Sequence, residues 1–105
     1  MVPEHAAAAK VVKMIEQEAN DILDVVAEHA RQAFQAELNF LEWMASNGSN
    51  PLDQFMERYI EWFERSESFA KDYLKISNNH PQLLRKFAAI VEPIRREMFG
   101  AEQQS

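Results

Sequence analysis

The chain has 105 residues, of which 47% are hydrophobic, and a formal net charge of −6. So many hydrophobic residues exclude a disordered chain, and the acidic balance argues against binding to a nucleic-acid backbone. The chain contains no cysteine, so disulfides, thiolate nucleophiles and cysteine-ligated metals are excluded. The chain has only two glycines and four prolines, too few turn-forming residues to connect many short strands, which indicates an all-α fold.

The first predicted helix covers about residues 4–45. Its apolar residues follow a spacing of threes and fours, and a second stripe lies beside the first. The main stripe contains Val12, Ile15, Ala19, Ile22, Val26, Ala33 and Phe40, and His29 and Ala36 lie on it as well. The adjacent stripe contains Leu23, Ala30, Phe34, Leu41 and Met44. Together the stripes form a broad face that is typical of a helical bundle.

A polar break precedes the second predicted helix, which covers about residues 51–76. Asn50 can cap this helix, and Pro51 suits its first position. One apolar stripe alternates by four and three and contains Leu52, Met56, Tyr59, Phe63, Ser66, Ala70 and Tyr73. The other recurs every seven residues and contains Phe55, Trp62, Phe69 and Ile76. The polar side offers Glu61–Arg65 and Glu67–Lys71 pairs at a favourable spacing.

A second break, with Asn79 or His80 as the cap, precedes the third predicted helix at about residues 81–99. We expect this helix to bend at Pro93, because proline removes a backbone hydrogen bond. Gly100 should end it, and residues 101–105 should fray.

Helix lengths and loop lengths predict a long antiparallel hairpin plus a kinked third helix, in one domain. At about 1.5 Å per residue the three helices are roughly 60, 39 and 28 Å long. If the third helix folds back, it completes a three-helix bundle over the last two-thirds of the first. The first turns, which carry Val11, Val12 and Ile15, then have no partner within the chain. If it instead continues along the first helix, the surface is flatter and more open. Both arrangements indicate association, so we expect a homo-oligomer.

Nothing in the sequence predicts catalysis, a metal site or a cofactor. The histidines at positions 5, 29 and 80 lack the one-turn spacing of a helical metal site, and no glycine-rich phosphate loop occurs. We expect His29, on the apolar stripe, to be partly buried with a hydrogen-bond partner, and His80 to belong to the cap.

Residues 1–9 lack the pattern of a secretory signal, and no stretch approaches the roughly 20 apolar residues that span a bilayer. We therefore expect a cytoplasmic, non-enzymatic protein.

Aromatic residues gather around the first break and along the second helix. Most should form ordinary core, but some should meet a partner, because tryptophan and tyrosine are favoured anchors. Basic residues do not alternate with these rings, which disfavours a nucleic-acid stacking platform. The predicted partner or oligomer interface consists of Val11, Val12, Ile15, Trp43, Phe55, Trp62 and Phe69.

The segment ARQAFQAEL at 30–38, the short polar break and the return helix starting DQFMERY at 53–59 resemble the phasins. These are small helical proteins that coat polyhydroxyalkanoate granules in bacteria. The resemblance covers about residues 12–76 and lies in the spacing of the apolar residues and in the amino-acid composition. It implies a protein that binds an apolar granule surface through a helical face, often as an oligomer. The third helix with Pro93, and the fall in alanine content after the first helix, depart from the family.

Two hypotheses follow from the sequence. The first is a non-enzymatic interaction or assembly protein that self-associates and docks a protein partner through an aromatic-rich amphipathic face. The alternative is a phasin-like coat protein of polyhydroxyalkanoate granules.

Overall fold

The computed structural model describes residues 3–46 and 51–100, with the backbone alone for residues 3–5. Within these ranges the chain is helical and contains no strand, which confirms the predicted all-α fold. The elements are α1 (Pro3–Ser46), α2 (Leu52–Asn79), the short 3-10 helix η1 (Pro81–Leu83) and α3 (Leu84–Phe99). The predicted Asn50 cap and the predicted frayed tail lie outside the described residues.

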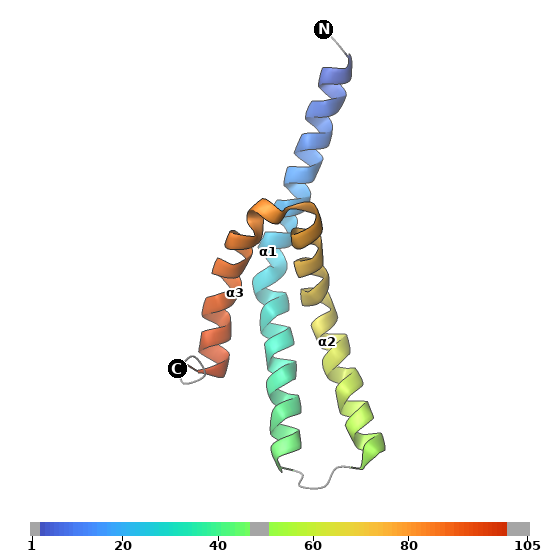
Figure 1. Cartoon of the computed structure of the whole chain (residues 1–105), viewed down its shortest axis with the longest axis vertical. Coiled ribbons are helices and arrows are strands. Elements are labelled where there is room, and N and C mark those ends of the chain that lie inside the picture. The colour runs from blue at the N-terminus through green and yellow to red at the C-terminus, as the bar shows by residue number, and fades with distance from the viewer. Residues whose placement is uncertain (1–2, 47–50, 101–105) are drawn as a thin grey trace.

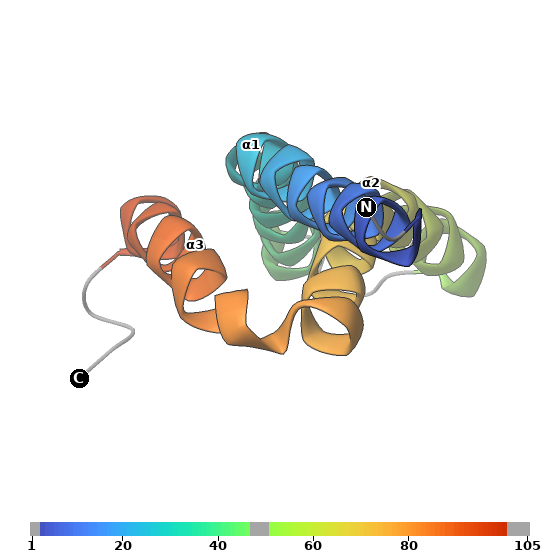
Figure 2. The same ribbon diagram turned by 90° about the horizontal axis from the view of Figure 1, so that it is seen from above.

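The three helices lie side by side with α1 in the middle (Figure 1). α2 returns antiparallel to α1, and α3 folds back at η1 to run in the same direction as α1. Seen from above, α2 and α3 occupy different sides of α1 (Figure 2). The Cα atoms span 71 × 33 × 17 Å, so the molecule is a long and flat layer. The third helix therefore folds back, which is the first of the two arrangements that the sequence left open.

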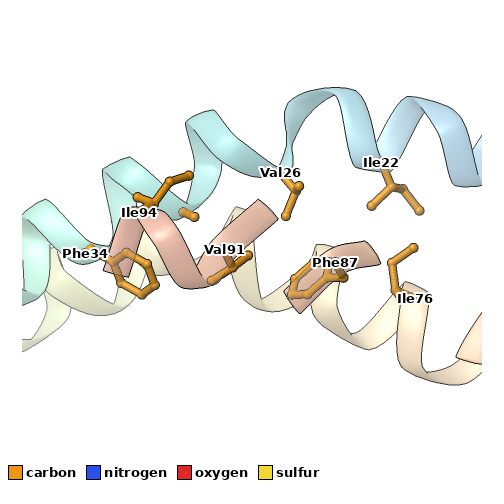
Figure 3. Packing of buried hydrophobic residues seen from close by; sticks show 8 residues of the cluster. Ile22, Val26, Phe34, Ile76, Phe87, Val91 and Ile94 are labelled. Carbon is orange, nitrogen blue, oxygen red and sulfur yellow. The ribbon is translucent and has the colours of Figure 1, made fainter. Parts of the chain in front are cut away.

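The hydrophobic core lies where all three helices meet. Residues of α1 there face Ile76 of α2 and three residues of α3 (Figure 3). The cluster consists of Ile22, Val26, Ala30, Phe34, Ile76, Phe87, Val91 and Ile94. Burying one large apolar side chain contributes roughly 1.5–3 kcal/mol, so this cluster is the main source of stability. The buried part of the predicted α1 stripe begins at Ala19 and ends at Ala36.

α3 covers less of α1 than the sequence predicts. The rings of Phe34 and Phe99 lie 5.7 Å apart, and Arg31 lies 3.6 Å from Glu97, so α3 ends beside residue 34 of α1. Beyond that point α1 has α2 as its only neighbouring helix among the described residues. The predicted bundle over the last two-thirds of α1 is thus wrong in extent, because η1 sets where α3 begins, and from there its 16 residues, a rise of about 24 Å, end beside residue 34.

α2 turns only one of its two apolar stripes toward α1. The stripe with seven-residue spacing faces inward: Ile76 is fully buried, and Phe55, Trp62 and Phe69 are half-buried. The stripe that alternates by four and three is largely exposed, for example at Leu52 and Phe63. A helix at the edge of a flat layer has one neighbour to pack against, so a second stripe stays in solvent.

The two predicted ion pairs on the polar side of α2 are present. Arg65 lies 3.1 Å from Glu61, and Lys71 lies 2.8 Å from Glu67. The hydrogen bond from Lys71, and then its charge, lower the pKa of the Glu67 carboxyl. Both pairs are exposed, so they contribute little to the free energy of unfolding.

The turn between α2 and α3 is built around His80. Its backbone N–H donates to the oxygen of Ile76 at 2.9 Å, and its oxygen accepts from the N–H of Leu83 at 2.9 Å. The backbone of His80 thus ends α2 and begins η1. The side chain does not cap either helix and is instead buried, with 2% exposure. The prediction that His80 belongs to the cap is therefore confirmed, although its backbone and not its side chain makes the capping hydrogen bonds.

α3 continues through Pro93 without a break. The carbonyl of Ala89 loses its usual donor there, but both residues are exposed, so water can satisfy the oxygen. The predicted bend at Pro93 stays a prediction. Gly100 ends α3 with a φ of 86°, and its N–H donates to the oxygen of Arg96, as expected for a glycine after a helix.

Candidate functional site

Residues 3–18 of α1, here called the arm, project beyond the other helices (Figure 1). Every side chain from Ala6 to Glu18 is exposed. Four large apolar residues lie within this stretch: Val11 is 53% exposed, Val12 52%, Met14 70% and Ile15 47%. The arm is thus a helix of about four turns that carries an exposed apolar face. Among the described residues only its last turn, from Met14 to Glu18, lies near α2 and η1.

Residues 35–46 of α1 and 52–65 of α2 form the opposite end of the molecule, here called the tip. Five half-exposed rings pack against one another there. They are Phe40, Trp43, Phe55, Tyr59 and Trp62. Phe40 lies at the centre of this aromatic cluster, stacked on Trp62 with the ring centroids 5.6 Å apart. Because α3 does not reach the tip, the rings have no third helix to cover them.

A cleft of about 160 Å³ opens at the tip beside Phe40 and Trp62. Its charged rim consists of Arg58, Glu61 and Arg65. Glu61 lies 3.1 Å from Arg65 and 3.9 Å from Arg58, and the Arg58 guanidinium stacks on the Trp43 ring at 5.7 Å. The charged groups at the rim therefore pair with one another or with a ring.

The exposed stripe of α2, here called the outer stripe, runs from the tip toward the turn. Its members are Leu52, Met56, Phe63 and Ala70 of the predicted stripe, together with Leu74 one turn beyond Ala70. Leu52 is 76% exposed and Phe63 is 60% exposed, which is high for side chains of this size. This stripe gives α2 an apolar face outside the core.

The structure divides the predicted interface between the two ends of the molecule and the core. Val11, Val12 and Ile15 lie on the arm and are exposed. Trp43, Phe55 and Trp62 lie in the aromatic cluster at the tip and are half-buried. The seventh residue, Phe69, lies elsewhere.

Phe69 packs within the chain. Its ring lies 5.5 Å from that of Phe34 and stacks on that of Phe87 at 5.8 Å. It thus supports the core and leaves little surface for a partner.

The exposure of Met14 and of most of the outer stripe could not be predicted from the sequence. Helical periodicity locates an apolar stripe, but it does not say which of two stripes on one helix faces the core.

Two histidines make polar contacts inside the fold. Nδ1 of His29 lies 2.6 Å from Oδ2 of Asp72, and because a carboxylate oxygen only accepts, the ring nitrogen donates. The prediction of a partly buried His29 with a hydrogen-bond partner is confirmed, although the sequence did not identify Asp72. His80 Nε2 lies 3.5 Å from Glu18, and neither ring nitrogen has a hydrogen-bond partner among the described residues.

Among residues 3–46 and 51–100, no group of three or more histidines and carboxylates is placed to hold a metal ion. No helix in the described part of the chain is long and apolar enough to cross a membrane.

Comparison of the chain with protein-family models, with curated proteins and with solved structures finds no match. The resemblance to phasins therefore stays a prediction.

Proposed function

We propose that the protein is a non-enzymatic, cytoplasmic assembly protein that self-associates and docks a protein partner through its exposed amphipathic faces. The observation that supports this most directly is the arm. Val11, Val12, Met14 and Ile15 lie within five residues, and each is about half exposed or more. An isolated helix of this length is marginal in water, because most helical stability in proteins comes from packing of an apolar face. A second molecule can supply that packing.

The aromatic cluster is the proposed surface for docking a partner. Trp43 and Trp62 offer large, rigid rings that are partly covered by Phe40, so little side-chain entropy remains to be lost on binding. Tryptophan and arginine are enriched at the energetic centres of interfaces, and Arg58 already stacks on Trp43.

Sedimentation velocity over a wide range of concentrations tests self-association. We expect the average mass to rise with concentration above that of one chain. A variant with Val11→Gln and Met14→Gln removes part of the exposed apolar face of the arm and should shift the mass toward one chain. The control variant, Glu57→Gln with Glu64→Gln, changes two exposed residues of α2 and should behave like the parent. A parent that stays monomeric at every concentration contradicts the proposal.

The outer stripe of α2 favours a second candidate function, that of a phasin-like coat on an apolar granule. A helix with an exposed apolar face can lie on such a surface, and the flat shape of the molecule offers that face without unfolding the core.

Flotation with polyhydroxyalkanoate particles tests the coat function. A coat protein floats with the particles, and Leu52→Gln with Phe63→Gln abolishes flotation, while the Glu57 and Glu64 control does not. A parent that ignores the particles argues for the assembly function alone.

A further inference from the structure

The charge of α1 changes sign along its first half. Lys10 and Lys13 are the only lysines or arginines before Arg31, and the next charged residues are all acidic. These acids are Glu16, Glu18, Asp21, Asp24 and Glu28, and all of them are exposed. Neither lysine has an ion pair with an acid among the described side chains. The arm therefore presents a basic segment next to an acidic one.

One side of α1 combines these charges with apolar residues. Positions 7, 11, 14, 18, 21 and 25 alternate by four and three, so they share one side of the helix. These residues are Ala7, Val11, Met14, Glu18, Asp21 and Val25, all of them exposed. This seam has apolar residues toward its two ends and acids in between. Lys10 flanks it, and Lys13 lies about a third of a turn from its centre, so the long side chain of Lys13 has to reach round the helix toward a partner.

A groove of about 600 Å³ lies along the same side, between α1 and α2. Met14, Ile22 and Val25 give it an apolar lining, and Glu18 and Asp21 give it acidic groups. Lys75 of α2 is its only basic lining residue. A segment that fits this groove needs apolar residues with positive charge beside them, and the arm itself has that composition.

The geometry points to a second copy of this chain as the occupant: each arm lies antiparallel along residues 18–25 of the other α1, about a two-fold axis near residue 16. This arrangement rests on the proposed self-association and specifies the surfaces that make it. In this register Lys10 lies opposite Asp21 of the partner subunit, and Lys13 lies opposite Glu18 of the partner subunit. Ala7 meets Val25, and the two Met14 side chains lie near the axis.

The charge pattern selects this register over its alternatives. A parallel pair places each lysine beside the same lysine of the other copy. An antiparallel pair of the arms alone, centred near residue 11, also brings Lys10 and Lys13 of both copies together. Only a centre near residue 16 places the basic segment of each copy against the acidic segment of the other. The two-fold axis repeats every contact, which gives four lysine–carboxylate pairs and a closed dimer.

Charge reversal tests the register in sedimentation velocity. The first variant carries Lys10→Glu with Lys13→Glu, and the second carries Glu18→Lys with Asp21→Lys. Each variant alone faces like charges in all four pairs, so its dissociation constant should rise roughly 100-fold, since each exposed pair contributes a few-fold and reversal acts on all four. In a heterodimer of the two variants every reversed residue of one faces a reversed residue of the other with opposite charge, and the native lysines again face the native acids. An equimolar mixture should therefore restore dimers, all of them heterodimers.

A matched control carries Arg85→Glu with Lys86→Glu, which changes the net charge as much as the first variant but on exposed positions of α3. It should dimerise like the parent. Glu18 lies 3.5 Å from the buried His80, so circular dichroism checks that the second variant is folded. If it is not, Lys10→Glu and Asp21→Lys as single substitutions repeat the same mixing experiment.

The outcomes separate this inference from the proposed function. If the parent self-associates and the reversals do not weaken it, or the folded variants do not recombine on mixing, the register is wrong and self-association stands. An equal effect of the α3 control also overturns the register, because net charge then explains the loss. A parent that is monomeric throughout overturns both.

Discussion

The imidazole of His29 and the carboxylate of Asp72 join α1 to α2 through a hydrogen bond of 2.6 Å. The two residues are 43 positions apart in the chain, and Asp72 is only 8% exposed. Asp72 and His80 are the two buried polar residues of the described chain, and Asp72 is the one with a close partner. A buried carboxylate needs such a partner, because its charge loses the stabilisation that water gives.

A double-mutant cycle on this pair should show strong coupling. His29→Leu leaves the buried carboxylate of Asp72 without its donor, so we expect the free energy of unfolding to fall by about 2–4 kcal/mol. The double variant His29→Leu with Asp72→Leu should lose less than the sum of the two single variants, because no unpaired charge remains. Urea unfolding followed by circular dichroism measures all four proteins. Additive losses would falsify the view that the two side chains stabilise one another.

Replacing His80 by leucine should keep or raise stability. Both ring nitrogens are buried without a hydrogen-bond partner among the described residues, and an unsatisfied buried polar group costs roughly 1–3 kcal/mol. Leucine fills a similar space without that cost, so we expect a gain of up to about 1 kcal/mol in thermal or urea unfolding. The neighbouring exposed Asn79→Leu serves as the control and should change little. A clear loss in His80→Leu alone would show that the imidazole has a stabilising role.

Trp62 and Phe63 are adjacent in sequence but should differ greatly in their response to alanine. Trp62 stacks on Phe40 and packs against Tyr59, so Trp62→Ala should cost about 2–4 kcal/mol. Phe63 is 60% exposed, and Phe63→Ala should stay within about 0.5 kcal/mol. Chemical denaturation of the two variants gives the comparison directly. Equal losses would place both rings in the same environment, against the structure.

Removing residues 1–16 should weaken self-association and leave the fold of each chain intact. The core begins at Ala19, and every side chain from Ala6 to Glu18 is exposed. The helical signal per residue should therefore stay nearly unchanged, while the average mass in sedimentation falls toward one chain. Loss of helical structure on truncation would show instead that the arm stabilises its own chain.

Helix positions and the main core stripe could be predicted from sequence for specific reasons. Pro51, Pro81 and Gly100 lie at or next to helix ends, where their backbone restrictions fit, and the apolar spacing from Ala19 to Ala36 marks the buried side of α1. These signals depend only on residues close in sequence, so the packing of the helices against one another does not change them.

Relations between helices could not be predicted in the same way. Both stripes of α2 are apolar, and only the position of α1 decides that Phe69 is packed and Phe63 is exposed. The partner of His29 is 43 residues away and has no marker in the sequence. The length of α3 was predicted nearly correctly, but the end of the bundle depends on where η1 places its first turn.

The candidate site was predicted in its parts but not in its arrangement. Val11, Val12 and Ile15 were expected to lack an internal partner. All three are about half exposed, although Ile15 lines a shallow pocket together with His80 and Leu83. The separation of the arm from the aromatic cluster follows from α1 being one uninterrupted helix of 44 residues. The identity of the apolar residues alone does not predict how far apart the arm and the aromatic cluster lie.

This unbroken helix also acts as a rigid spacer. Its two ends are about 66 Å apart, so the arm cannot bend back to cover the aromatic rings of its own chain. A pair joined near residue 16 holds its two tips roughly 90 Å apart, facing in opposite directions. Such a dimer is rigid and bivalent. It can bridge two copies of a target that lie about 90 Å apart, and it gains avidity only when both binding sites of the target are available at once.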